Sequence, residues 1–138
     1  MSHFEIFGAY LVALLVLLLI LFIGVVRIRL SGVASLGDGG DPALIRAIRA
    51  HGNFVENAPF VLIGMLSMMQ LGTSSLMLHV VGATFLVSRI LHAVGIYQDT
   101  PAPRPRQIGT VLTLLTYIIL IVYIAVLVFS SRGSYGIS

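Results

Sequence analysis

The residues best suited to chemistry lie in one block of the chain, "RAIRAHGNFVEN" at positions 46–57. A helix turns ~100° per residue, which places five polar side chains of this block within an arc of roughly 100°. These five are Arg46, Arg49, Asn53, Glu56 and Asn57. His51 falls on the opposite side of the same helix. The block therefore predicts a polar stripe that suits a ligand with carboxylates and amides.

Two interpretations of this stripe stay open. Arg46 and Arg49 suit the membrane interface as anchors, and Asn53 and Glu56 suit structural hydrogen bonds between helices. Glu56 lies one to two turns inside the membrane, where an ionisable side chain is costly and by default indicates a functional site. Glu56 can instead pair with Arg49, or with an arginine of another helix. Such a pair still leaves Arg46, Asn53 and Asn57 facing the same polar notch.

Two further segments bring polar groups to the same depth. Arg89 and His92 are three residues apart and share a helical face, whereas Tyr97 lies about 80° round from Arg89. A single histidine in a membrane helix is a hydrogen-bonded structural residue or a ligand-binding one, and both interpretations of His92 stay open. Arg104 and Arg106 stand where the last apolar segment begins, a position that also suits interfacial anchors.

The composition indicates an integral membrane protein. The 138 residues are 58% hydrophobic and only 9% charged, and the mean hydropathy is +1.06. Asp41 and Pro42 fit the N-cap and first residue of a helix. We expect a single all-α domain over residues 1–138, a four-helix transmembrane bundle. Its helices are the four segments with the about 20 residues that a bilayer needs, roughly 5–28, 43–70, 74–97 and 106–130.

The arginines predict how the bundle is oriented. Lysine is absent, so all eight positive charges are arginines. With four spans, the loops at 29–42 and 98–105 share one side of the membrane and have six arginines in or beside them. Both termini share the other side, which holds only Arg132. The positive-inside rule therefore predicts that these two loops are cytoplasmic and both termini lie opposite, in the inner membrane if the protein is bacterial.

The composition also argues against several kinds of site. The chain has no cysteine, so it has no thiol nucleophile, disulfide or thiolate metal site, and any sulfur chemistry must come with a ligand. The histidines share no spacing, and Asp38 and Asp41 lie in a glycine-rich loop, so we expect no metal site. The net charge of +3 is too small, and the chain too apolar, for nucleic-acid binding.

The polar stripe resembles a signature of the MAPEG family, the membrane-associated proteins in eicosanoid and glutathione metabolism. The second helix of that family carries roughly R-x-x-R-A-x-x-N-x-x-E and then proline, a pattern met here by "RAIRAHGNFVENAP". The segments "SRILHAVGIY" and "RQIG" also resemble parts of the third and fourth helices of the family. The resemblance covers nearly the whole chain.

The resemblance implies a homotrimer of four-helix protomers, with glutathione as co-substrate between subunits on the cytosolic side of the bilayer. It implies that Arg49, Asn53 and Glu56 hold the carboxylates and amides of glutathione. An arginine at the end of the first helix joins them, a role for Arg27 or Arg29.

The resemblance also implies where the reaction takes place. In the family, an arginine at the head of the fourth helix faces the thiol. Arg106 matches this position through "RQIG", and Arg104 is the near alternative. Arginine is not a base at neutral pH, but its fixed charge favours the nucleophilic thiolate over the thiol. Members of this kind are glutathione transferases or peroxidases that act on lipophilic electrophiles or lipid hydroperoxides in detoxification.

The chain departs from the family pattern at a few positions. Asn57 stands where many members have tyrosine, and His92 stands at the first of two helix-three tyrosines. The second of these falls at Ile96 or Tyr97. The departures favour a general, bacterial type of transferase over an enzyme that forms leukotrienes or prostaglandins. The candidate ligand-binding residues are then Arg27, Arg29, Arg46, Arg49, Asn53, Glu56, Asn57, Arg89, His92 and Tyr97.

Two other functions remain as alternatives. Some members of the family bind lipid and assist another enzyme, so a non-catalytic lipid-binding or scaffold protein is the second hypothesis. The complete helix-two motif and the retained Arg106 favour catalysis over this role. A small transporter with Glu56 as its proton-coupled site is the third, and the lack of inverted repeats argues against it.

Overall fold

Four long helices make up nearly all of the described chain. The computed structural model describes residues 1–98, 100 and 103–134, with the side chains of residues up to 130, and it contains no strand in that part of the chain. The all-α, four-helix prediction is confirmed, and each predicted boundary lies within four residues of the observed one. The helices are α1 (His3–Leu30), α2 (Pro42–Gln70), α3 (Ser75–Tyr97) and α4 (Arg104–Ser134).

Capping residues fix the helix starts. The side chain of Asp41 accepts a hydrogen bond from the backbone N–H of Leu44 at 2.7 Å, and Pro42 occupies the first turn of α2, as predicted. Ser2 and Glu5 form a reciprocal capping box at the start of α1. Asp41 therefore fixes where the helix that carries the polar stripe begins.

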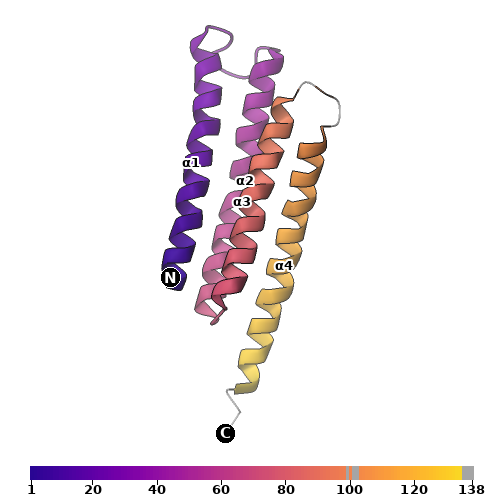
Figure 1. Cartoon of the computed structure of the whole chain (residues 1–138). Helices are drawn as coiled ribbons and strands as arrows, with labels where there is room; N and C mark the ends of the chain where they lie inside the picture. The colour runs from indigo at the N-terminus through magenta and orange to yellow at the C-terminus, as the bar shows by residue number, and fades with distance from the viewer. Residues whose placement is uncertain (99, 101–102, 135–138) are drawn as a thin grey trace.

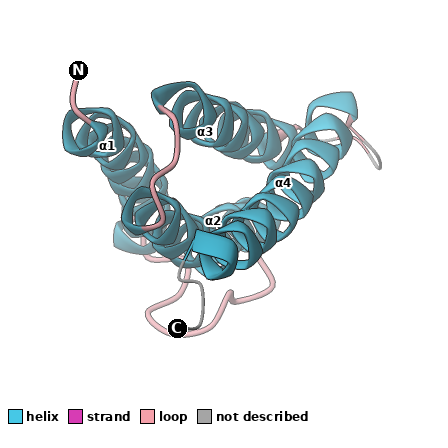
Figure 2. Ribbon diagram, turned by 90° about the horizontal axis from the view of Figure 1, so that it is seen from below, coloured by secondary structure: helices cyan, strands magenta, loops and turns pink. Residues whose placement is uncertain are grey.

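The helices run alternately in opposite directions, so that α1 begins and α4 ends at the same end of the bundle (Figure 1). Viewed end on, α2 and α3 lie between α1 and α4 (Figure 2). Among the described residues, α1 and α4 do not touch each other, whereas every other pair of helices is in contact. Of the three most apolar helices, α3 is the most enclosed, with 44% of its most apolar stretch buried against 11% in α1 and 17% in α4.

Three of the four helices are long and apolar enough to cross a membrane: α1, α3 and residues 104–130 of α4. Three of the four predicted spans therefore stand out by length and composition. The helix α2 has the length, at 29 residues, but the polar block at 46–57 makes it less apolar than the other three. Exposed leucine, isoleucine, valine and phenylalanine side chains cover the outer faces of α1 and α4, which is the surface that lipid requires.

The buried face of α2 determines where its polar stripe points. Most stripe residues come one position before a buried residue and so lie about 100° to one side of the buried face. His51 follows the buried Ala50, which places it on the other side, where its ring lies 6.2 Å from that of Phe22 in α1. The stripe and His51 therefore face different neighbours, as the helical projection predicts. The buried residues of α2 are Leu44, Ala47, Ala50, Phe54, Ala58, Val61, Met65 and Met68.

A polar pocket at the arginine-rich end of the bundle

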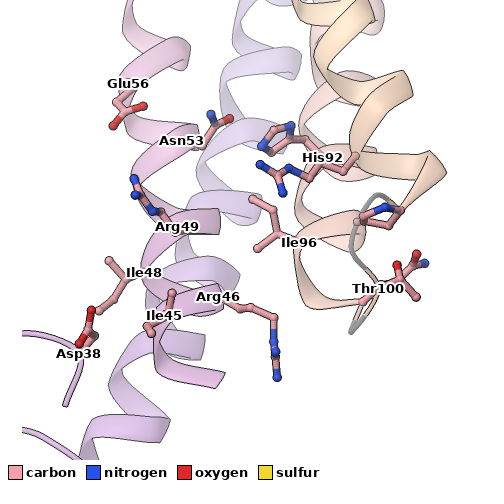
Figure 3. A pocket seen from close by; sticks show the side chains of 15 residues that line it. Asp38, Ile45, Arg46, Ile48, Arg49, Asn53, Glu56, His92, Ile96 and Thr100 are labelled. Atoms are coloured by element: carbon pink, nitrogen blue, oxygen red, sulfur yellow. The ribbon is translucent and has the colours of Figure 1, made fainter. Parts of the chain in front are cut away.

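A partly open pocket of about 1140 Å³ lies at the end of the bundle where α2 begins and α3 ends (Figure 3). Its walls are the first half of α2, the last turns of α3, the first turn of α4, the loop that precedes α2 and the link between α3 and α4. Figure 3 shows Arg49, Asn53 and Glu56 along α2, with His92 of α3 across from them. The polar lining residues are Asp38, Arg46, Arg49, Asn53, Glu56, His92, Gln98, Thr100 and Arg106.

Six candidate residues from the sequence meet in this pocket. They come from three helices, because the stripe of α2 faces α3 and the head of α4. Three polar lining residues were not predicted: Asp38, Gln98 and Thr100. All three lie in connecting segments, where no helical periodicity indicates which way a side chain points. The six predicted residues are Arg46, Arg49, Asn53, Glu56, His92 and Arg106.

Three charged side chains of the pocket have no partner among the described residues. Arg49, Glu56 and Arg106 are exposed, and no side chain of these three forms a hydrogen bond or an ion pair with another described residue. The pairing of Glu56 with Arg49, which the sequence left open, therefore does not occur. Two cations and one anion that are free to bind face a single pocket, which suits a ligand with charges of both signs.

Glycines bring the backbone of α4 close to α3 and so position Arg106. A Cβ atom on Gly95 would lie 2.7 Å from the Cα atom of Arg106. A Cβ atom on Gly109, the glycine of "RQIG", would lie 2.6 Å from the backbone nitrogen of His92. Only residues without a side chain permit this approach. The glycine of that motif thus has a packing role in this bundle.

His92 is nearly buried, with 8% of its surface exposed, and its Nδ1 atom lies 3.3 Å from the hydroxyl oxygen of Thr110. That hydroxyl donates its hydrogen to the backbone carbonyl of Arg106 at 2.9 Å. A hydroxyl has only one hydrogen to donate, so Nδ1 of His92 must donate to it. The neutral imidazole is then left with Nε2 as a hydrogen-bond acceptor.

Two predicted ligand-binding residues of the first and third helices point elsewhere. Arg29 donates hydrogen bonds to the carbonyls of Ala34 and Ser35 at 3.2 and 3.1 Å, so it holds the loop after α1 and does not line the pocket. The hydroxyl of Tyr97 lies against α1, where a Cβ atom on Gly24 would be 2.9 Å from it.

Two further predicted residues belong to the interior of the bundle. Asn57 donates to the backbone carbonyl of Asn53 at 2.7 Å and accepts from the hydroxyl of Tyr117 at 3.1 Å. Arg89 is almost completely buried behind Asn53. Neither Asn57 nor Arg89 lines the pocket.

The last two predicted arginines, Arg27 and Arg104, are exposed outside the lining of the pocket. Of the two candidates at the head of α4, only Arg106 is a lining residue, so the geometry favours Arg106 over Arg104 for a role in the site.

Comparisons with known proteins agree with the fold. The model of the MAPEG family matches residues 7–126, which is most of the chain. Two curated relatives are the inner membrane protein YecN of Escherichia coli strain K12 and that of Escherichia coli O6:H1. Each is 40% identical to this chain over 73 residues, which are 53% of this chain and 56% of the relative. The chain thus covers little more than half the length of these relatives. No solved structure matches.

Proposed function

The chain belongs to the MAPEG family, and from that premise we propose that it is a membrane-embedded glutathione transferase or peroxidase. The observation that carries the proposal is the pocket itself, in which Arg49 and Glu56 of α2 share one space with Arg106 of α4, all three side chains without a partner among the described residues. Three apolar helices and the likeness to an inner membrane protein support an integral location in the bacterial inner membrane.

The α2 side of the pocket fits the charges of glutathione. This tripeptide carries two carboxylates and one ammonium group. The guanidinium groups of Arg46 and Arg49 suit the carboxylates, since an arginine donates two parallel hydrogen bonds to such a group. Glu56 suits the ammonium group, and Asn53 suits a peptide group or a carboxylate. These four residues bind the ligand but do no chemistry on it.

Arg106 supplies the activation step. A cation close to a thiol lowers the pKa of the thiol, and the effect grows where water is excluded. Arg106 would thus hold glutathione as thiolate after the thiol proton has left to water. In conjugation, the thiolate sulfur bonds to a carbon of the electrophile, and the leaving group departs with its electron pair. In peroxide reduction, two glutathione molecules become a disulfide while the hydroperoxide becomes an alcohol and water.

The membrane supplies the second substrate. The outer face of α4 exposes apolar side chains along its length, so a lipophilic molecule dissolved in the bilayer reaches the helix that carries Arg106 without crossing water. Since the pocket of one protomer is partly open, we also propose that a homotrimer closes it. The lining arginines would then lie at the cytoplasmic side, as the orientation predicted from the sequence requires.

The proposal is tested with the purified protein in detergent, glutathione and two lipophilic substrates, a chloronitrobenzene and a fatty-acid hydroperoxide. We expect conjugate or alcohol to form with at least one substrate, and Arg106→Ala to abolish it. Arg104→Ala is the matched control and should keep most of the activity. Glutathione binding without turnover of either substrate would favour the non-catalytic, lipid-binding alternative. If glutathione does not bind, the proposal is wrong.

A further inference from the structure

Arg89 is a charged residue in the interior of a membrane bundle. It belongs to α3, the most enclosed of the apolar helices, and only 3% of its side chain is exposed. A buried charge of this kind is costly unless its surroundings compensate for it, and in a membrane it calls for a functional explanation. Arg89 does not line the pocket, so direct contact with a ligand does not supply that explanation.

The contacts of Arg89 join three helices. Its NH1 group donates to the side-chain oxygen Oδ1 of Asn53 and lies 3.4 Å from the backbone carbonyl of the same residue, both on α2. Its NH2 group donates to the hydroxyl of Thr113 on α4, and its Nε–H donates to the hydroxyl of Ser88 at 3.3 Å. The ring of Phe85 lies 5.3 Å from the guanidinium carbon. Within the described residues, these hydrogen-bond acceptors are all neutral.

We propose that Arg89 is a positioning residue that orients the carboxamide of Asn53 toward the ligand. A guanidinium group donates hydrogen bonds and accepts none, so the atom of Asn53 that meets it must be the oxygen. The NH2 group of Asn53 then has no acceptor among the described residues, and Asn53 lines the pocket. The carboxamide of Asn53 therefore presents a hydrogen-bond donor to the pocket. Without Arg89 it could rotate and present its oxygen instead.

The backbone of Asn53 is fixed as well. Its carbonyl accepts a hydrogen bond from the side chain of Asn57 at 2.7 Å, and Asn57 is itself held by the hydroxyl of Tyr117. Arg89 and Asn57 thus hold Asn53 from two directions. Arginine suits this task better than lysine, because its planar fork reaches Asn53 on α2 and Thr113 on α4 at the same time.

This inference rests on the proposed function for the identity of the ligand, because a fixed donor binds a carboxylate or a peptide carbonyl of glutathione. A purely structural role for Arg89 is the competing explanation. The two explanations predict different coupling between substitutions at Arg89 and Asn53. A positioning residue acts on the ligand only through Asn53, whereas loss of a structural residue weakens the site whether Asn53 is present or not.

The first experiment is a double-mutant cycle with glutathione as the probe. Asn53→Ala and Arg89→Gln should each weaken binding about tenfold, the effect of one hydrogen bond to a charged group. The double variant should bind no more weakly than Asn53→Ala alone. Additive losses, near one hundredfold in the double variant, would overturn the positioning role.

The second experiment needs no ligand and uses the fact that the chain has only two asparagines, Asn53 and Asn57. Protein with 15N-labelled asparagine should give two side-chain NH2 signal pairs by NMR, assigned with Asn57→Ala. Arg89→Gln, and the milder Arg89→Lys, should shift or broaden the Asn53 pair by more than the Asn57 pair, because Asn57 meets Arg89 only through the backbone carbonyl of Asn53. An unchanged Asn53 pair in the folded variants would refute the proposal.

Adding glutathione to the same labelled protein tests the positioning role of Arg89 separately from the proposed function. If the Asn53 pair depends on Arg89 but does not respond to glutathione, the positioning role stands and the proposed function fails. If the pair responds to glutathione but not to changes at Arg89, the proposed function stands and the positioning role fails.

Discussion

Gly95 of α3 packs directly against the backbone of Arg106 at the head of α4. A Cβ atom on Gly95 would lie 2.7 Å from the Cα atom of Arg106, well inside the 3.4 Å at which ordinary van der Waals contact begins. The distance between these two helices therefore depends on a missing side chain. It also sets how far the guanidinium group of Arg106 reaches into the pocket beside His92.

Gly95→Ala should push α4 away from α3. Overpacking of this kind costs about 1–3 kcal/mol of unfolding free energy, and it should also lower the activity by moving Arg106. Thermal unfolding in detergent, followed by circular dichroism, measures the first effect. Gly8→Ala is the matched control, because no atom lies within 4 Å of a Cβ atom at Gly8. Equal melting temperatures for the two variants would refute this view of the α3–α4 contact.

Arg49→Ala and Glu56→Gln should each weaken glutathione binding by about 10- to 100-fold. Each substitution removes a charged group that would form hydrogen bonds with glutathione. His51→Ala should leave the affinity nearly unchanged, since His51 lies against Phe22 of α1. Isothermal titration calorimetry of the three variants measures the difference. Similar losses in all three would mean that the faces of α2 are wrongly assigned.

In its neutral form His92 should carry its proton on Nδ1, because the hydroxyl of Thr110 already donates to the carbonyl of Arg106. NMR of the 15N-labelled histidines, with His92→Gln to assign the signal, distinguishes the two tautomers. Thr110→Val should remove the preference for this tautomer. A proton found on Nε2 of His92 in the unchanged protein would contradict the hydrogen-bond assignment.

Glutathione binding should weaken as salt is added. Arg46 and Arg49, the two arginines assigned to the carboxylates, face a partly open pocket, and salt screens attraction between partly exposed charges. The diethyl ester of glutathione, which lacks both carboxylate charges, is the control and should show little salt dependence. Equal salt dependence for the two ligands would mean that the arginines do not bind the carboxylates.

The polar stripe could be predicted from the sequence because a helix fixes the angle between successive residues. Arg49, Asn53 and Glu56 therefore share a face of the helix. An error of one turn in the predicted start of that helix would not have changed this result. Arg106 could be singled out only through the family motif, since a single arginine at the start of an apolar segment suits an anchor equally well. The structure adds a physical reason for that motif, the close approach at Gly109.

The sequence could not predict how far each side chain lies from its neighbours. Periodicity placed Arg89 on the same face as His92, but not behind Asn53, because that depends on the spacing of three helices. Arg29 turns to loop carbonyls whose positions follow from turn geometry. Tyr97 lies against Gly24 because the absence of a side chain there leaves room for its hydroxyl group.

The central claim is that Arg106 holds glutathione as a thiolate in this pocket. The most direct measurement is a titration of the detergent-solubilised protein with glutathione, followed by the ultraviolet absorbance of bound thiolate. We predict an absorbance that saturates with binding in the unchanged protein and in Arg104→Ala, and that disappears in Arg106→Ala while glutathione still binds. Binding without a thiolate signal in the unchanged protein, or the same signal in Arg106→Ala, would contradict the claim.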